Sequence, residues 1–497
     1  MPSWAGSLNA GYGYPLFIFN YSLPYYLISL FHFLGFTFIA SMKLFLSLTS
    51  IVSGIFMYLF CKDLFKNKLA AFTSSIFYIF APYHLIDLHF KVVIGELLSF
   101  TLAPLVFFFL NKLYDKKSVL LLLTTGIFFG ALIMSHVVIG LFFGLLILIY
   151  ILLRAIKDKK TSSLLFILCI FPIAGIISIY TWLTPFFLSI YTFIQLLGLP
   201  NVHFPTIIEL AYSPWKMGLL FQGPKGEISN LIGYTQILVL LLALASVLAK
   251  KVSKFISFGL KFWIMSCFII IFLITPYSKL IWEVIPFIKA TGSHRLLLLL
   301  AFSISVLAGY LSIFFKNRKI LVYLLIVLTI GSTILNWGQR RVIPQINDSV
   351  LMKNIGKSTI EGEAHFYANS KWVDIKNPWF SKLPKSHLEI ISGTGEIREI
   401  SRISTNHKYL INAKTSLKIQ ENTLYFPGWK GFVNGKEVLL SPSNKGIIQA
   451  SIPKGYSKFE IAYQDILIYK LLKTISVLSI IGSFIFISLK FLRSYLR

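Results

Sequence analysis

Long apolar stretches alternate with short polar ones along most of the chain. Apolar runs of about 18 residues or more recur, and a helix of that length crosses a hydrocarbon layer of about 30 Å. Only a helix satisfies its own backbone polar groups within lipid, so the pattern predicts a bundle of membrane-spanning helices. We expect about eleven spans, at residues 41–61, 69–82, 94–111, 119–135, 137–153, 163–187, 232–249, 262–275, 295–315, 320–337 and 467–489.

Clusters of Lys and Arg between these stretches set the expected topology. Cytoplasmic loops carry an excess of basic residues, so consecutive clusters should be separated by even numbers of crossings. The apolar run 119–153 must then divide into two spans at Ser135-His136, and residues 69–110 must divide at a polar outer connector, 82–91. This parity places the carboxyl terminus in the cytoplasm and the amino terminus outside.

Residues 338–465 have a different pattern, with frequent charges and alternation at period two, which indicates strands with one buried face. The expected strands are 387–391, 408–412, 416–420, 423–426, 446–452 and 458–463. Asn434-Gly435 is typical of a two-residue hairpin turn, and 453–455 predicts another turn. Trp429 could present an aromatic platform to a sugar, but a core position is the favoured interpretation. The segment is predicted to be a β-sandwich.

The predicted fold is mainly α: a polytopic membrane bundle with an extracytoplasmic β-sandwich domain before the last span. Its parts are an outer loop with an interfacial helix (1–40), the transmembrane domain (41–337), the β-domain (338–465), and a final span with a basic cytoplasmic tail (466–497). Residues 1–40 would lie outside with no span before them, so we expect a first span to be missing from this sequence. The alternative is that residues 23–40 themselves cross the membrane, but Pro24 and the closeness of Lys43 to the next span favour an interfacial helix.

Composition supports the membrane assignment and excludes other classes. The chain is 56% hydrophobic and 13% charged, with a mean hydropathy of +0.75, which is too apolar for an ordinary soluble protein. The net charge of +28 does not indicate nucleic acid, because the basic residues lie in clusters between apolar runs. The three cysteines lie in or beside apolar runs and suggest no disulfide framework.

Charged residues near membrane depth are costly and are therefore candidates for function. The first group comprises His84, Asp87, His89, Lys91 and Glu96, in and just after the connector. Carboxylate, imidazole and ammonium groups together could hold a divalent cation or a phosphate. The alternative is an interfacial loop whose charges face water and lipid headgroups.

A second group precedes the span at 295–315 and comprises Glu283, His294 and Arg295. Arg presents planar donors that suit phosphate oxygens, so a lipid-linked phosphate is a candidate ligand. The alternative is an arginine that reaches a headgroup from a helix end. His136, which stands alone at the predicted tight turn, is interpreted as structural.

Several different short motifs follow one another in a particular order from one end of the chain to the other. They are Trp4 with Gly11-Tyr12-Gly13-Tyr14-Pro15, Leu23-Pro24-Tyr25-Tyr26, Pro82-Tyr83-His84, Gly95-Glu96, Ser135-His136, His294-Arg295 and Phe426-Pro427-Gly428-Trp429. In these motifs the chain resembles YfhO-like and "6-pyruvoyl-tetrahydropterin synthase-related" bacterial membrane proteins, which belong with the GT-C class of glycosyltransferases. The pterin name is historical and implies no pterin chemistry.

The resemblance implies a GT-C-like bundle in a bacterial or archaeal cytoplasmic membrane. The implied activity transfers a sugar, with inversion, from a polyprenyl-phosphate donor to an extracytoplasmic glycan, lipid or protein. Such enzymes usually carry an acidic residue in the first outer loop, but residues 1–40 contain no Asp or Glu. Either Asp87 or Glu96 has taken over as the catalytic carboxylate, or that residue belongs to the missing span.

The remaining candidates would bind the donor's lipid phosphate, and a divalent cation is the candidate cofactor. They are His84, Lys91, Glu283, His294 and Arg295. Two other functions remain open. One is a transporter or flippase for lipid-linked sugars, since buried charges and interrupted spans also mark transport paths. The other is a non-catalytic envelope assembly factor.

Overall fold

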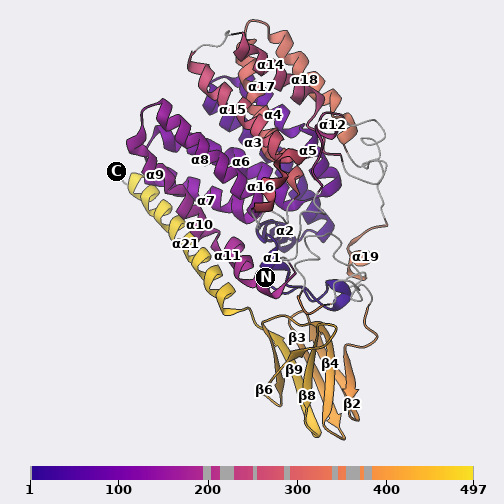
Figure 1. The fold of residues 1–497 in the computed structure, drawn as a ribbon. Coiled ribbons are helices and arrows are strands. Elements are labelled where there is room, and N and C mark those ends of the chain that lie inside the picture. Colours follow the sequence, from indigo (N-terminus) through magenta and orange to yellow (C-terminus); the bar gives the residue numbers. More distant parts are fainter. Residues whose placement is uncertain are drawn as a thin grey trace. The chain divides into compact units, whose positions relative to one another are not determined.

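The computed structural model describes residues 3–193, 203–212, 229–249, 254–284, 292–337, 345–353, 370–373 and 383–495. Internal contacts divide the chain into two compact units (Figure 1). The strand unit comprises Met1–Asn20, Ile179–Leu197 and Pro344–Ile475, and the helical unit comprises Tyr21–Ser178, Gly198–Ile343 and Ser476–Arg497. Each unit is described by itself.

The helical unit is built from apolar helices. They are α2 (Leu23–Phe33), α3 (Phe38–Phe65), α4 (Lys68–Ile79), α5 (Pro82–Ile86), α6 (Ile94–Asp115), α7 (Val119–Ser135), α8 (Val137–Lys157), α9 (Leu164–Leu168), α10 (Ile170–Ile177), α12 (Ile207–Ala211), α14 (Tyr234–Leu248), α15 (Lys254–Ile274), α16 (Lys279–Val284), α17 (Leu297–Phe314) and α18 (Lys319–Ser332), with the later part of α21 (Leu467–Tyr495).

Every predicted span coincides with helical structure, so the mainly helical, apolar architecture is confirmed. Five of the described helices are long and apolar enough to cross a membrane alone, and three bent helix pairs raise that number to eight. Helices α7, α14 and α18 have 17, 15 and 14 residues, fewer than the roughly 20 of a typical span. The number of crossings and the side that each loop faces therefore stay predictions.

Helices α6 and α17 form the centre of the helical unit. The apolar part of each is 89% buried within the protein. Protein therefore surrounds these two helices, and polar side chains on them are held by neighbouring residues. Ser99 of α6, for example, hydrogen-bonds Ser135 at the end of α7, with 2.9 Å between the two hydroxyl oxygens.

The segment expected to be a polar outer connector is instead helical and largely enclosed. Residues 82–86 form α5, and Asp87–Lys91 form a short π-helix. The side chains from Pro82 to Asp87 are buried. The interpretation of this segment as a loop with charges facing water and headgroups was wrong, because Asp87 is 0% exposed. A π-turn is a local widening that is frequent at functional sites.

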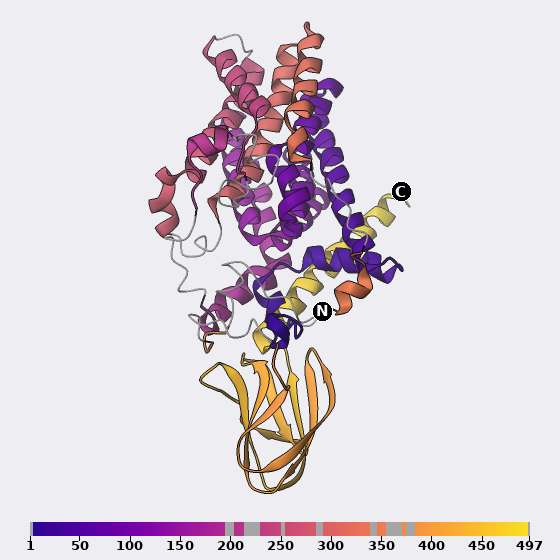
Figure 2. The same cartoon turned by 90° about the vertical axis from the view of Figure 1, so that its right-hand side faces the viewer.

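The strand unit contains a β-sandwich-like region of two antiparallel sheets, as predicted (Figure 2). One sheet has the order β1-β4-β8-β7 and the other β2-β3-β9-β5-β6. The strands are β1 (Leu388–Ser392), β2 (Gly395–Ile403), β3 (Asn406–Ala413), β4 (Leu417–Leu424), β5 (Trp429–Val433), β6 (Lys436–Val438), β7 (Ser441–Pro442), β8 (Ile447–Ile452) and β9 (Gly455–Tyr463). The described helices of this unit are α1 (Leu16–Phe19), α11 (Ile179–Leu188), α19 (Asp348–Lys353) and the start of α21.

Most sequence-based expectations for the strands are confirmed. Asn434 and Gly435 have φ of 49° and 80° and close the β5–β6 hairpin, in which Val433 pairs with Lys436. Trp429 is 6% exposed and belongs to the core, as expected. The stretches predicted at 416–420 and 423–426 overlap one continuous strand, β4, which ends at Leu424. The turn after β8 leads to β9 in the other sheet.

Strand β2 was missed. Its isoleucines, Ile397, Ile400 and Ile403, recur every third residue, whereas a regular strand alternates every second. A bulge between Glu399 and Ser401 interrupts the regular alternation within the strand. As an edge strand, β2 is also mostly exposed, so its sequence lacks a continuous apolar face.

The amino-terminal residues pack onto the β-sandwich as part of the strand unit. Trp4 is 1% exposed, and its ring centroid lies 5.4 Å from those of both Trp429 and Tyr463. The backbone N–H of Leu424 donates to the carbonyl of Tyr12 at 2.8 Å, which joins this segment to the end of β4. The motifs around Trp4 and Trp429, far apart in the sequence, therefore form one aromatic core.

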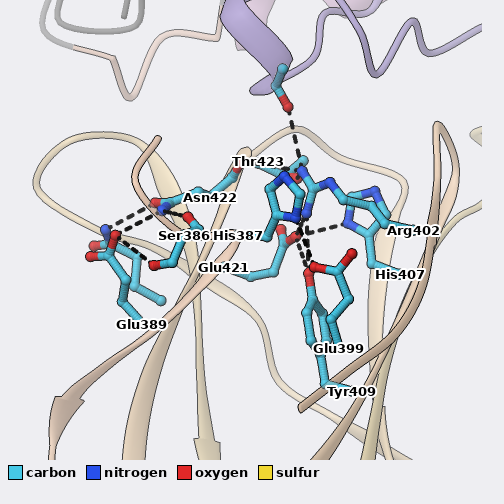
Figure 3. A network of polar contacts seen from close by, with 12 residues as sticks. Ser386, His387, Glu389, Glu399, Arg402, His407, Tyr409, Glu421, Asn422 and Thr423 are labelled. Carbon is cyan, nitrogen blue, oxygen red and sulfur yellow. Dashed lines mark hydrogen bonds and ion pairs between the residues drawn. The ribbon is translucent and has the colours of Figure 1, made fainter. Parts of the chain in front are cut away.

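A buried polar network holds the same region together (Figure 3). The carboxylate of Glu421, 1% exposed, accepts from Arg402, from His407 at 2.8 Å and from the hydroxyl of Tyr409 at 3.0 Å. Burial raises the pKa of Glu421, but His407 and Arg402 more than offset this effect and lower the pKa to about 2. Arg402 also donates to the Gly11 carbonyl at 3.4 Å and so ties the amino-terminal segment to β2.

The strand unit should lose stability in acid. Because the pKa of Glu421 falls from 4.5 to about 2 on folding, its stabilising contribution is complete above about pH 4.5 and is lost as the pH falls toward 2. At about 1.4 kcal/mol for each pKa unit, the loss is on the order of 3 kcal/mol. We expect the urea midpoint of the strand unit, measured by pulse proteolysis, to drop as the pH falls from about 4.5 to about 2. Glu421→Gln should be destabilised at neutral pH and should lack this part of the drop; an unchanged pH profile in that variant would contradict the assignment.

Candidate functional site

Glu96 lies in the first turn of α6 and is fully buried. Its Oε2 accepts a hydrogen bond from the Tyr83 hydroxyl of α5 at 2.6 Å. The preceding residue, Gly95, makes this position possible, because a Cβ there would collide with the Ser135 carbonyl and the Tyr21 ring. A small residue thus lets the start of α6 approach the turn between α7 and α8 closely.

Arg295 reaches Glu96 from a segment 199 residues away. It lies in a 3-10 turn, Ser293–Leu296, that leads into α17. Its Nη1 forms an ion pair with Glu96 Oε1 and lies 3.3 Å from Nε2 of His136. Its Nε and Nη2 have no hydrogen-bond partner among the residues that the structure describes. The guanidinium can therefore donate to a further group.

Lys91 lies between two carboxylates. Its ammonium is 3.5 Å from Asp87 Oδ1 and 3.6 Å from Glu96 Oε2, and it donates to the Tyr83 hydroxyl at 2.9 Å. Glu96 is engaged by Tyr83, Lys91 and Arg295. Within the described chain, Asp87 has only the ion pair with Lys91, and both of its buried oxygens lack a hydrogen bond.

The charges of this cluster are arranged by depth. Asp87 and Glu96 are 0% exposed, whereas the side chains of Lys91 and Arg295 are 13% and 23% exposed. A group that approaches from the accessible side would therefore meet the two cations first and the carboxylates behind them. This order suits the binding of an anionic group at the two cations and proton transfer at the buried carboxylates.

Of the residues predicted from the sequence, Asp87, Lys91, Glu96 and Arg295 come together. The other four, of which His89 is half-buried, do not join them by any described hydrogen bond or ion pair. The Nδ1 of His84 lies 3.1 Å from the Tyr78 carbonyl, and its ring stacks on Phe100 at 4.0 Å. Glu283 is exposed on α16, and His294 is partly buried beside Arg295.

Three members of the site were not singled out as ligands or catalytic groups. Tyr83 links Glu96 to Lys91, His136 contacts Arg295, and the Tyr21 ring lies 5.6 Å from the His136 ring. Tyr83 and His136 lie within motifs already noted, Pro82-Tyr83-His84 and Ser135-His136. Their position in those motifs was the available signal.

The geometry offers no support for a metal in this cluster. Among the described residues, no group of three or more His, Cys, Asp or Glu side chains could hold a metal ion. Lys91 already lies against the oxygens of Asp87 and Glu96, where it would repel a cation. The divalent cation predicted from the sequence stays a prediction.

Comparison with known families finds a match to the part of the chain that holds this cluster. The family model described as "6-pyruvoyl-tetrahydropterin synthase related domain; membrane protein" matches residues 18–343. The chain belongs to this family. The matched range includes all of the clustered residues and ends before the first strand of the β-sandwich. No curated protein matches the chain.

Membership of the PTPS-related family confirms the resemblance to this family that the sequence motifs indicated. It also confirms the assignment as a membrane protein. The relationship to the GT-C class stays a prediction. So does the orientation that places the β-domain outside and the carboxyl terminus in the cytoplasm.

Substitutions of Glu96 and Arg295 should have strongly non-additive effects on the free energy of unfolding. Removing one partner of a buried ion pair typically costs about 3–5 kcal/mol, because the other charge stays buried without compensation. We expect Arg295→Ala and Glu96→Ala each to be destabilised by about this amount, and the double variant to be destabilised by much less than the sum. Unfolding in detergent measures the coupling, and additive effects would show that the two side chains do not interact.

Proposed function

We propose that this PTPS-related protein is a GT-C-type membrane glycosyltransferase, which transfers a sugar from a polyprenyl-phosphate donor to an extracytoplasmic acceptor. The observation that carries the proposal is the cluster in which Lys91 and Arg295 lie in front of the buried carboxylates Asp87 and Glu96. The bilayer, the lipid-linked donor and a glycan, lipid or protein acceptor are its proposed partners.

The two cations would bind the phosphate of the donor. Arg295 has donors that no described protein group accepts, and Lys91 is a compact charge at the partly exposed edge of the cluster. As the bond between the anomeric carbon and the phosphate oxygen breaks, negative charge develops on the departing lipid phosphate. Fixed cations at that position lower the energy of the transition state.

Asp87 is the better candidate for the general base. A carboxylate that accepts from several donors is a weak proton acceptor, and Glu96 is engaged by Tyr83, Lys91 and Arg295. Asp87 has both oxygens free of described hydrogen bonds. Glu96 would then act as a positioning residue that holds Arg295 in place.

The proposed sugar transfer needs neither a nucleotide nor a redox partner. The acceptor hydroxyl attacks the anomeric carbon and passes its proton to Asp87. The new glycosidic bond forms as the bond to the phosphate oxygen breaks, and the polyprenyl phosphate leaves with the electron pair. Attack from the opposite face inverts the anomeric configuration.

Asp87→Asn should abolish most transfer activity. The amide is nearly isosteric but cannot accept the proton, and loss of a general base typically lowers the rate by about 10²–10⁴-fold. The measurement is transfer in proteoliposomes from a panel of polyprenyl-phosphate sugars to envelope extracts as acceptor. Glu396→Gln, on an exposed carboxylate of β2 outside the cluster, is the matched control and should be fully active. Full activity of Asp87→Asn would remove Asp87 from the mechanism.

Lys91→Met should weaken donor binding, because it removes one of the two cations proposed to bind the phosphate. A hydrogen bond to a charged group is worth about 1.5–3 kcal/mol, so affinity for undecaprenyl phosphate should fall roughly tenfold to a hundredfold. Affinity for the uncharged undecaprenol should change little. Native mass spectrometry can compare both lipids, with the exposed Lys279→Met as control. Equal binding of both lipids by the wild type would contradict a phosphate site.

A transporter of lipid-linked sugars is the second candidate. The helical pair Lys68–Ile79 and Pro82–Lys91 is bent by 46° at the start of the cluster, and broken helices with buried charge are typical of transport sites. Movement of an intact donor across the proteoliposome bilayer, without transfer of its sugar, would favour this function over catalysis.

A further inference from the structure

A cavity of about 410 Å³ opens in the strand unit, and none of its lining residues belongs to the cluster described above. The turn that follows β2, the start of β3, the chain before β1 and the amino-terminal segment surround it. Its lining includes Ser7, His387, Ser404 and His407, with Pro384 and Ile403 as apolar surface. This volume lies within the range of about 300–1,000 Å³ that is common for small-molecule sites.

Two imidazoles line this cavity, and each is oriented by its own carboxylate (Figure 3). The Nδ1 of His387 lies 2.7 Å from Glu399, and the Nδ1 of His407 lies 2.8 Å from Glu421. A carboxylate at Nδ1 favours the tautomer with its proton there, so Nε2 is left as an acceptor in the neutral ring. No described hydrogen bond reaches either Nε2.

The charges around the cavity are already compensated. Arg402 also lines it, but its Nη1 contacts Glu421 and Tyr409, and its Nη2 contacts Gly11, Asn422 and Thr423. Its guanidinium group is therefore not available to bind a phosphate or carboxylate through two parallel hydrogen bonds. No described group of three metal-ligating side chains is present either. The remaining polar atoms suit a neutral ligand that both donates and accepts hydrogen bonds.

We propose that this cavity binds a neutral polyhydroxylated ligand, a sugar ring of a glycan. Sugar hydroxyls would donate to the Nε2 atoms of His387 and His407 and would accept from the hydroxyls of Ser7 and Ser404. The apolar surface of Pro384 and Ile403 suits the C–H face of a pyranose. The site is separate from the proposed transfer reaction and does not require it, so the two can fail independently.

The test measures sugar binding directly in the full chain. The protein is placed in lipid nanodiscs, because maltoside detergents would themselves present sugar. Saturation-transfer NMR then titrates glucose, galactose, mannose and N-acetylglucosamine, and phosphorus NMR titrates inorganic phosphate. Ser404→Phe adds bulk at the exposed cavity wall, His387→Ala removes one acceptor, and the exposed Lys436→Ala on the hairpin is the control.

We expect at least one sugar to bind to the wild type and to Lys436→Ala equally. Binding should be lost in Ser404→Phe, and it should weaken roughly three- to tenfold in His387→Ala, as for one hydrogen bond. His387 is 46% exposed, so its variant keeps the test valid if Ser404→Phe fails to fold. Three results would overturn the proposal: no sugar binding by the wild type, sugar binding that both cavity variants retain, or binding of phosphate alone.

Discussion

The buried ion pair between Glu96 and Arg295 is the constraint on which the helical unit depends. A carboxylate with no exposed surface at the start of an apolar helix costs several kcal/mol unless it is compensated. Compensation comes from Arg295, 199 residues away, together with Lys91 and the hydroxyl of Tyr83. Four segments, α5, the π-turn, α6 and the start of α17, are thereby held at one point. A glycine before Glu96 supplies the space.

The strand unit uses the same physical device with different partners. Glu421 is buried, and Arg402, His407 and Tyr409 satisfy one of its oxygens. Arg402 extends the network to the carbonyl of Gly11, so the charge pair also fixes the amino-terminal segment on the sandwich. Arg402 uses both Nη1 and Nη2, whereas Nη1 of Arg295 alone contacts Glu96 and His136. In both units one arginine side chain thus joins segments that no continuous secondary structure connects.

The cluster in the helical unit is asymmetric in a way that favours chemistry over mere stability. A purely structural pair would be satisfied by matched charges, whereas here Asp87 has two buried oxygens without a described hydrogen bond and Arg295 has donors to spare. Buried polar groups are normally satisfied, so exceptions of this kind require a ligand, a water or a function. The proposed transfer reaction uses both: the unused donors bind phosphate, and the unused acceptor takes a proton.

The sequence by itself determined the architecture, because burial in lipid or in a sandwich imposes a periodicity that can be read along the chain. Apolar length predicted the helices, and alternation with Asn434-Gly435 predicted most of the sandwich. It also singled out Asp87, Lys91, Glu96 and Arg295, since charge next to apolar runs is costly wherever it lies. Tertiary structure alone decided that these four meet, that His136 and Tyr83 join them, and that the supposed connector is enclosed. Those outcomes depend on how helices distant in the sequence pack together, and periodicity carries no information about which partners a buried charge will find.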